Sequence, residues 1–276
     1  MIRKVKSVFA MLADLWRSRK LIIALSINDF KTRYAASMMG VLWAFVQPVI
    51  TVLVYWFVFE KGLRVGKQAM GGVEVPFLLF LISGLVPWFY FSDAWPNGTS
   101  SLISYSYLVK KVVFKISILP IVKVMASIYV HLFFVGLTLI IFWAYGYPPD
   151  LYSLQIVYYS FATFVLVLGL SYITASVVGF FRDLTEIINI LLQVLVWITP
   201  IMWNIDNTLP DGILRTVFKL NPMYYVVSGY RNALINKHWF WETPSLTIYF
   251  WLVTLFILGL GMLVFKRLKK HFADVL

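Results

Sequence analysis

Residues 38–59 read MMGVLWAFVQPVITVLVYWFVF and hold no Asp, Glu, Lys or Arg. A transmembrane α-helix needs about 20 consecutive apolar residues, because each residue adds about 1.5 Å along the helix axis and the hydrocarbon core is about 30 Å thick. This stretch therefore predicts a membrane-spanning helix.

Five more apolar segments follow this one. Hydrophobic residues make up 61% of the 276-residue chain and charged residues only 13%, whereas a soluble domain is about 25% charged. We therefore expect an all-α integral membrane protein with six transmembrane helices in one domain at residues 38–265. Pro87 interrupts the second segment and the fifth is short, so each of these is compatible with a broken or re-entrant helix. The later segments are residues 76–95, 116–145, 154–181, 187–203 and 244–265.

The distribution of basic residues predicts the orientation. If the N-terminus lies inside, most of the 24 Lys and Arg residues fall in inside segments, which is the usual bias of membrane proteins. Both termini are then cytoplasmic, and residues 266–276 form a basic cytoplasmic tail. This topology accounts for the net charge of +12, so the charge gives no reason to invoke nucleic acid. The chain has no cysteine, which excludes disulfides and thiolate metal sites.

Residues 1–37 are rich in Lys and Arg. Apolar residues recur there at helical spacing, which favours an amphipathic helix lying in the headgroup region of the membrane. A solvated N-terminal arm is the alternative, but a face that contains Trp16 needs an apolar partner. The residues of that face are Val8, Phe9, Leu12, Leu15 and Trp16.

Two segments outside the predicted spans are long enough for structure of their own. The inside loop at residues 96–115 has room for a short helix. The outside segment at residues 204–243 reads as two short amphipathic helices divided at Asn221 and Pro222, with apolar faces that dip into the membrane or cap a pore. The first face holds Ile213, Leu214, Val217 and Phe218, and the second holds Tyr224, Val227, Tyr230, Ala233 and Leu234.

The motifs of common enzyme and nucleotide sites do not match this sequence. The spans contain no H-E-x-x-H and no carboxylate pair, and GLRVGK at residues 62–67 lacks the spacing and the Ser or Thr of a phosphate-binding loop. We therefore expect no catalytic residues, no metal and no ATP site in this chain. His131 is the only ionisable residue well inside a span, and we interpret it as an interhelical hydrogen-bonding group rather than a proton relay. The driving energy for transport then has to come from a partner.

Aromatic residues make up 18% of the chain and include 11 Trp. Some form the usual interfacial belts, but others fall inside predicted spans. Flat aromatic faces suit the C–H-rich faces of sugar rings, so the enrichment favours a wide path for a non-ionic substrate. For any single residue, packing against lipid or protein is the ordinary alternative. The residues predicted to line the path are Trp43, Tyr55, Trp56, Phe59, Trp197 and Trp203.

Four stretches together carry a family resemblance. They are DFKTRYAASMMGVLWAFVQPVITVLVYWFVF at residues 29–59, GLVPWFYFSDAWPNGTSSLISYSYLVKKVVFKISILP at 84–120, FFRDLTEIINILLQVLVWITPIMW at 180–203 and NPMYYVVSGYRNALI at 221–235. In order and spacing they resemble the membrane subunit of bacterial ABC exporters for lipid-linked polysaccharides, the permeases for O-antigen, capsule and teichoic acid. One departure is Phe114-Lys115-Ile116, where the family often has Phe-Pro-Arg.

The resemblance implies a homodimeric permease that works with two copies of a separate cytoplasmic ATPase, which binds the ATP and Mg²⁺. A coupling helix near residues 97–109 would contact that ATPase, and Asn97 after Pro96 suits the N-cap of such a helix. The outside segment would form two gate helices, and spans one and five would line the channel. The coupling residues are Asn97, Ser100, Ser101 and Tyr105, and the gate residues are Asn221, Pro222, Tyr224, Tyr230 and Arg231.

The implied substrate is a polysaccharide on undecaprenyl diphosphate, O-antigen in the first place, moved across the bacterial cytoplasmic (inner) membrane. A diphosphate needs Arg or Lys donors, which Lys31, Arg33 and Arg182 near the inner opening can supply. The same three residues also suit topology-setting charge or contact with the ATPase. Teichoic-acid or capsule export is an alternative. More distant alternatives are a drug or small-lipid ABC export permease and a membrane-embedded glycosyl- or acyltransferase.

Overall fold

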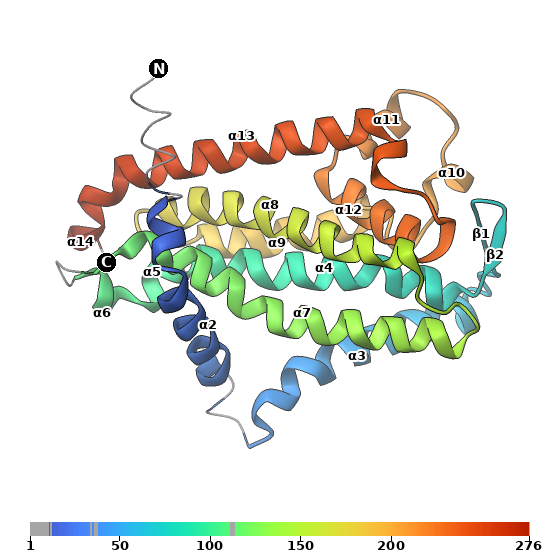
Figure 1. The fold of residues 1–276 in the computed structure, drawn as a ribbon, viewed down its shortest axis with the longest axis horizontal. Coiled ribbons are helices and arrows are strands. Elements are labelled where there is room, and N and C mark those ends of the chain that lie inside the picture. Colours follow the sequence, from blue (N-terminus) through green and yellow to red (C-terminus); the bar gives the residue numbers. More distant parts are fainter. Residues whose placement is uncertain (1–10, 12, 34, 36–37, 111–113, 276) are drawn as a thin grey trace.

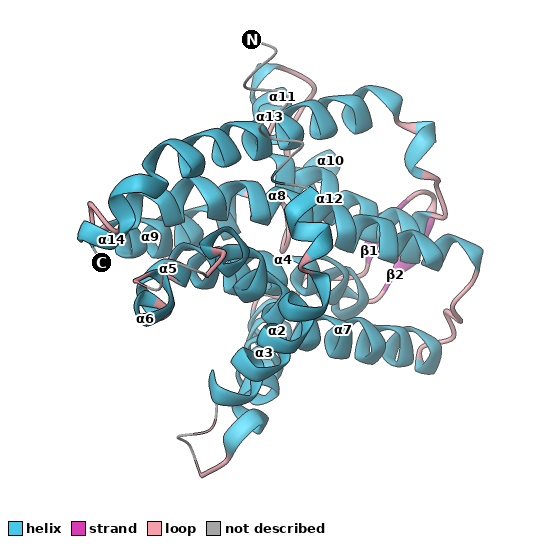
Figure 2. Cartoon of the chain, turned by 60° about the vertical axis from the view of Figure 1, so that its left-hand side comes forward, coloured by secondary structure: helices cyan, strands magenta, loops and turns pink. Residues whose placement is uncertain are grey.

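The computed structural model describes residues 11, 13–33, 35, 38–110 and 114–275. In this part of the chain almost all regular structure is helical, in agreement with the predicted all-α class. The long helices run side by side (Figure 1), and Figure 2 shows a short two-stranded hairpin beside them. In this hairpin β1 (Gln68–Met70) pairs antiparallel with β2 (Val73–Val75), and Gly71 and Gly72 turn between the strands with positive φ.

Five helices in the described residues are long and apolar enough to cross a membrane. They are α3 (Trp43–Trp56, inside a helical segment at Gly40–Gly62), α4 (Phe77–Thr99), α7 (Leu119–Ala144), α8 (Gln155–Val178) and α13 (Pro244–Leu268). They correspond to the first, second, third, fourth and sixth predicted spans. Pro87 lies inside α4 and does not end it, so a break at this proline is wrong. Buried helices tolerate proline because neighbouring helices satisfy the backbone groups that it frees.

The fifth predicted span, residues 187–203, is shorter than expected. Its helix, α9 (Leu184–Ile198), has 15 residues, which gives about 22 Å at 1.5 Å per residue against about 30 Å of hydrocarbon. The helix ends because Pro200 disfavours the helical conformation at the residue before it, and Thr199 is accordingly extended, with ψ 126°. Residues 199–203 continue as non-helical backbone.

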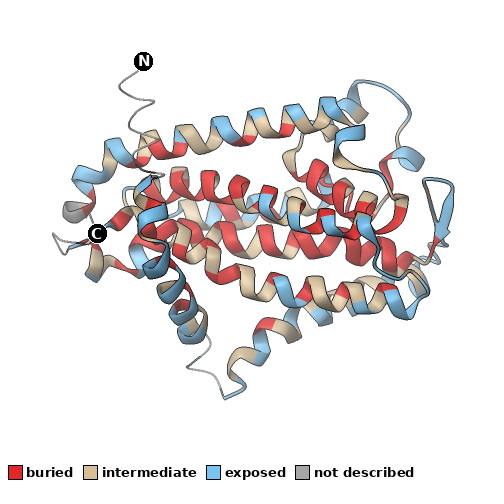
Figure 3. Cartoon of the chain, in the orientation of Figure 1, coloured by how far each residue is buried: buried red, intermediate tan, exposed pale blue. Residues whose placement is uncertain are grey.

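The core lies along α4 and α8, with α12 (Pro222–Arg231) beside them, and these elements are largely buried in Figure 3. Two glycines bring α8 and α13 close together. A Cβ at Gly169 would lie 2.8 Å from the Leu258 backbone nitrogen, and a Cβ at Gly261 would lie 2.6 Å from the Gly169 carbonyl oxygen. Small residues at such crossings let membrane helices pack through their backbones. In contrast, α3 has a single buried residue, Ala44.

The two ends of the bundle carry different short elements (Figure 1). One, named the α2 end, holds α2 (Arg19–Arg33), α5 (Ser101–Ser104), α6 (Ser106–Val109) and α14 (Phe272–Val275). The other, named the hairpin end, holds β1, β2, α10 (Ile205–Thr208) and α11 (Ile213–Lys219). The elements nearest the two termini, α2 and α14, thus share one end, as a topology with both termini on one side requires.

The N-terminal segment is helical where the structure describes it, but its contact with the protein is partly polar. Leu15 of the predicted apolar face is buried and Trp16 is 72% exposed, while Val8, Phe9 and Leu12 lie outside the described residues. The following helix, α2, contacts α7. Apolar and polar groups both dock this segment, since Leu15 and Ile22 are buried in one apolar cluster with residues of α7, α8 and α13. The buried residues of α2 are Ile22, Ser26 and Asp29.

Candidate functional site

A group of charged and polar residues, the Asp29 network, joins α2 to its neighbours at the α2 end. Asp29 is only 5% exposed. The Lys123 ammonium of α7 lies 2.7 Å from Asp29 Oδ1, and Tyr105, between α5 and α6, donates its hydroxyl to the same oxygen at 2.7 Å. Burial and this hydrogen bond raise the pKa of Tyr105 well above its ordinary value. A buried carboxylate requires such compensation by a cation and by hydrogen-bond donors.

Arg33 extends the Asp29 network to α4. Its guanidinium donates to Asp93 Oδ2 at 3.1 Å and lies 3.5 Å from Asp29 Oδ2. This predicted diphosphate contact is thus placed between two carboxylates. The other two, Lys31 and Arg182, are exposed. A role of all three in contacting a diphosphate stays a prediction.

The predicted coupling helix at residues 97–109 is not one helix. α4 continues to Thr99, and the chain then forms the short helices α5 and α6. Asn97 lies inside α4, where its amide donates back to the Asp93 carbonyl oxygen at 2.6 Å and to the Asp93 carboxylate at 2.9 Å. An N-cap at Asn97 is therefore wrong, because the side chain bonds to the preceding turn instead of the following one.

The predicted coupling residues face the protein more than its surroundings. Ser101 and Tyr105 are buried, and Ser100 donates its hydroxyl to the Asn97 carbonyl oxygen at 3.1 Å. The large exposed apolar side chains of this segment are Ile103 and Tyr107. A partner that docks on α5 and α6 would therefore meet these two side chains, whereas Tyr105 is turned inward and donates to Asp29.

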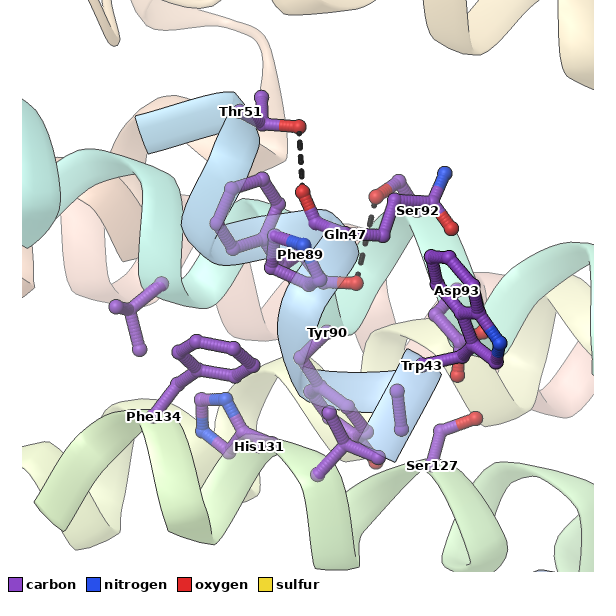
Figure 4. A pocket seen from close by; sticks show the side chains of 14 residues that line it. Trp43, Gln47, Thr51, Phe89, Tyr90, Ser92, Asp93, Ser127, His131 and Phe134 are labelled. Atoms are coloured by element: carbon purple, nitrogen blue, oxygen red, sulfur yellow. Dashed lines mark hydrogen bonds between the residues drawn. The ribbon is translucent and has the colours of Figure 1, made fainter. Parts of the chain in front are cut away.

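A cavity of about 330 Å³ lies between α3, α4 and α7 (Figure 4). Its lining mixes aromatic faces with hydroxyl, amide and carboxylate groups, which is the composition of sites for polar organic ligands. Trp43, a predicted path-lining residue, is 46% exposed at this cavity. The main polar contributors are Gln47 of α3, Ser92 and Asp93 of α4, and Ser127 and His131 of α7.

The other predicted path-lining aromatics lie elsewhere. Tyr55 and Trp56 at the end of α3 are partly buried against the core, and so is Phe59 in the helical turn that follows. Trp197 and Trp203 line a shallow groove of about 550 Å³. That all these residues face one path stays a prediction.

His131 forms interhelical hydrogen bonds, as the sequence predicts. Its Nε2 lies 2.9 Å from Ser160 Oγ of α8 and 3.1 Å from Tyr230 OH of α12. Ser160 Oγ and Tyr230 OH are themselves 2.7 Å apart. Tyr230, a predicted gate residue, is only 1% exposed. It therefore acts from within the protein, where it ties α12 to α7 and α8.

Arg231, another predicted gate residue, holds the non-helical end of the fifth predicted span. It is 4% exposed, and its guanidinium donates to the carbonyl oxygens of Pro200 and Ile201 at 2.6 Å each. The central guanidinium carbon lies 3.7 Å from the centre of the Phe80 ring. Non-helical backbone at membrane depth is tolerated only where its polar groups are satisfied. Arg231 supplies two donors to this backbone just where α9 stops.

The outside segment divides at Asn221 and Pro222, as predicted. Asn221 caps α12 and donates its amide to Thr199 Oγ1 at 2.8 Å, and Pro222 takes the first helical position, which suits a residue without an N–H. The predicted apolar face of the second helix packs on protein, since Tyr224 is 8% exposed, whereas Ile213 of α11 is 86% exposed. Only α11 thus offers an apolar face that could dip into lipid. Gate roles for both helices stay a prediction.

A family model described as ABC-2 type transporter matches residues 20–235. The chain belongs to the ABC-2 type transporter family. Among similar proteins, an O-antigen export system permease protein RfbA of Klebsiella pneumoniae is 29% identical over 93% of this chain and 95% of its own length. An RfbA of Myxococcus xanthus is 27% identical over 95% and 97%. The polysialic acid transport protein KpsM of Escherichia coli is 27% identical over 87% and 90%.

The part of the chain matched by the ABC-2 type transporter family contains the features described above. The Asp29 network, the cavity between α3, α4 and α7, and the Arg231 contacts all fall within residues 20–235. With its long apolar helices, this ABC-2 type transporter is a multi-pass membrane protein. The transporter class predicted from the sequence is confirmed.

The sequence does not predict two features of this ABC-2 type transporter. One is the pairing of Asp29 with Lys123, for which a signal exists: Lys123 lies near the end of a predicted span, and a charge there needs a partner. The other is the support that Arg231 gives to α9. No local sequence pattern predicts this contact, because neither segment shows which side chain donates to the backbone carbonyls that follow Ile198.

Proposed function

We propose that this chain is the membrane-spanning subunit of an ATP-driven exporter that moves a lipid-linked polysaccharide across the bacterial cytoplasmic membrane. The observation that carries the proposal is its near full-length similarity to O-antigen export system permease proteins, at 27–29% identity over 93–95% of the chain. The family match and the long apolar helices support the same class.

O-antigen on an undecaprenyl diphosphate carrier is the substrate that we favour. The O-antigen permeases align over more of this chain than the two KpsM proteins, which reach 87% of it at 26–27% identity. KpsM is named for polysialic acid transport, so capsule export is the nearest alternative. Teichoic-acid export and drug or small-lipid export follow at a greater distance.

The driving energy in this proposal comes from two copies of a cytoplasmic ABC ATPase, which bind the ATP and Mg²⁺, and the permease acts as a homodimer. The α2 end is cytoplasmic, because the Lys and Arg bias puts both termini there. Ile103 and Tyr107 then offer the ATPase an exposed contact at α5 and α6. Movement of these short helices reaches α2 and α7 through the hydrogen bond from Tyr105 to Asp29 and the ion pair of Asp29 with Lys123.

The translocation path runs between the two copies in this proposal. Lys31, Arg33 and Arg182 contact the carrier diphosphate at the inner opening, and Arg33 also compensates the carboxylates of the Asp29 network. The aromatic residues of α3 and of the Trp197–Trp203 groove face the moving sugars. Residues 1–37 lie at the inner membrane surface, residues 38–265 form the transmembrane domain with its outer gate at 204–243, and residues 266–276 form the cytoplasmic tail.

Deletion and complementation of the gene test the export function. We expect the deletion strain to lose its surface polysaccharide and to accumulate lipid-linked polysaccharide inside, and the intact gene to restore the surface polymer. As a control, the intact gene restores nothing in a strain whose partner ATPase lacks its catalytic base. Surface polysaccharide at the parental level in the deletion strain would contradict the proposal. Covalent turnover of a lipid-linked sugar by the purified chain alone would favour the transferase alternative instead.

A further inference from the structure

The cavity between α3, α4 and α7 contains polar groups that the described protein leaves unsatisfied. Ser127 and His131 are 1% and 3% exposed, and neither Ser127 Oγ nor His131 Nδ1 has a hydrogen-bond partner among the described residues. The Val86 backbone carbonyl lies near the His131 ring, so the unmet demand is clearest at Ser127 Oγ. A buried polar group without a partner costs about 1–3 kcal/mol. A guest in the cavity that carries hydroxyl groups would satisfy it.

The same cavity has aromatic walls. Trp43 of α3, Phe89 of α4 and Phe134 of α7 line it, and the Phe89 and Phe134 rings meet edge to face with centroids 6.1 Å apart. In Figure 4 the amide of Gln47 and the hydroxyl of Ser92 lie on the α3 and α4 side, while Ser127 rises from α7. The face of an aromatic ring is electron-rich and attracts C–H groups. Aromatic faces beside hydroxyl and amide groups therefore suit a ring with C–H faces and a hydroxyl-bearing edge.

The charge of the lining restricts the guest further. Asp93 is the only Asp, Glu, Lys or Arg among the described residues that line the cavity, and its carboxylate is paired with Arg33. A carboxylate accepts hydrogen bonds from hydroxyl groups, and the described lining includes no Lys or Arg that would bind a phosphate. The diphosphate of a lipid carrier is thus disfavoured here, and an uncharged, hydroxyl-rich group is favoured.

We propose that this cavity binds one uncharged sugar unit of the exported polysaccharide, an inference that rests on the export function proposed above. Trp43 stacks on the face of the sugar ring, and Ser127 and Asp93 bond its hydroxyl groups. The volume of about 330 Å³ equals roughly ten water molecules at about 30 Å³ each and lies at the lower end of the range of about 300–1,000 Å³ for ligand pockets. That is room for one or two sugar rings and not for a length of polymer.

Saturation-transfer NMR on the intact permease in lipid nanodiscs, prepared without glycoside detergents, tests this site. The probes are the methyl glycosides of glucose, galactose, mannose and N-acetylglucosamine, with glucose 1-phosphate as a charged counterpart. We expect saturation transfer to at least one neutral glycoside, and at least fivefold less transfer in Ser127→Val and in Trp43→Ala. Trp241→Ala is the matched control, because Trp241 is 55% exposed and outside the cavity lining.

Three results would overturn the sugar site. They are no transfer to any of the four glycosides, equal transfer in wild type and Ser127→Val, and stronger transfer to glucose 1-phosphate than to methyl glucoside. Valine fills part of the cavity and removes the unpaired hydroxyl, so Ser127→Val should melt at or above the wild-type temperature. If it melts lower, Ser127→Ala, which is smaller, gives the same comparison.

Export measurements separate this site from the proposed function. Loss of surface polysaccharide in Ser127→Val and Trp43→Ala, with normal membrane levels of both variants, supports the site. Normal export in both variants, in a strain whose export needs the chain, overturns the site and leaves the export function standing. Glycoside binding in a chain whose deletion leaves surface polysaccharide unchanged overturns the export function alone, because the NMR experiment needs neither the ATPase nor transport.

Discussion

Replacing Arg231 with Met removes the two donors that satisfy the carbonyls of Pro200 and Ile201 beyond the end of α9. Each hydrogen bond from a charged group is worth about 1.5–3 kcal/mol, so the loss is about 3–6 kcal/mol. Methionine keeps much of the volume and also contacts aromatic rings, so it replaces part of the stacking on Phe80. Removing a buried cation returns part of its desolvation cost. We therefore expect the lower end of the range, about 3 kcal/mol.

The assay is thermal unfolding of the permease in nanodiscs, read from tryptophan fluorescence. With at least about 2 °C for each kcal/mol in a chain of this size, Arg231→Met should melt about 6 °C lower or more. Arg231→Lys should fall between, because an ammonium keeps the charge but lacks the fork that reaches both carbonyls. Arg64→Met is the matched control at an exposed arginine. If Arg231→Met melts within about 2 °C of the wild type and exports normally, the support of α9 by Arg231 is refuted.

Three further predictions concern other contacts. Asp29→Ala leaves the buried Lys123 ammonium without its carboxylate, which costs about 3–5 kcal/mol, so amide exchange in α2 should speed up. Unchanged protection would show that the Asp29 network does not dock α2. Gly169→Ala places a Cβ 2.8 Å from the Leu258 backbone nitrogen and should lower stability by about 1–3 kcal/mol; a normal melting temperature would mean that α8 and α13 part easily. Burial raises the pKa of Asp150, but the ion pair with Lys237 and the hydrogen bonds from Ser153 outweigh burial, and the net pKa is lowered. The ionised carboxylate therefore contributes less than about 1 kcal/mol to stability. This contribution is present above pH ~4 and is lost as the pH falls through the pKa of the folded state. Lys237→Met should reduce this part of the acid sensitivity, while the hydrogen bonds from Ser153 to Asp150 remain. An unchanged melting profile at low pH would contradict the prediction.

Hydropathy predicts the long helices because a chain in lipid has to satisfy its backbone within each segment. The first, second, third, fourth and sixth predicted spans form as helices of crossing length. The fifth fails in length, because the apolar letters continue through Thr199 and Pro200 to Trp203 while the helix stops at Ile198. Hydropathy counts apolar residues, whereas proline decides where the helical conformation ends.

The site is predicted less well than the fold, because its contacts join residues far apart in the sequence. Tyr105 is separated from Asp29 by 76 positions, and the periodicity of neither segment indicates the other. Local patterns also leave open which way a short helix faces. Asn97 has the residue type of a cap, yet its side chain bonds back to Asp93 within α4.

The Asp29 network has a consequence for the order in which the protein is made. Asp29 precedes the first span, whereas its partners Tyr105 and Lys123 come after the second span and within the third. While the ribosome is still adding the early spans, the carboxylate has neither partner, so α2 cannot seat. Its docking is therefore a late step of biogenesis, and a nascent chain that stalls before the third helix presents an undocked N-terminal segment to the cell's quality-control proteases.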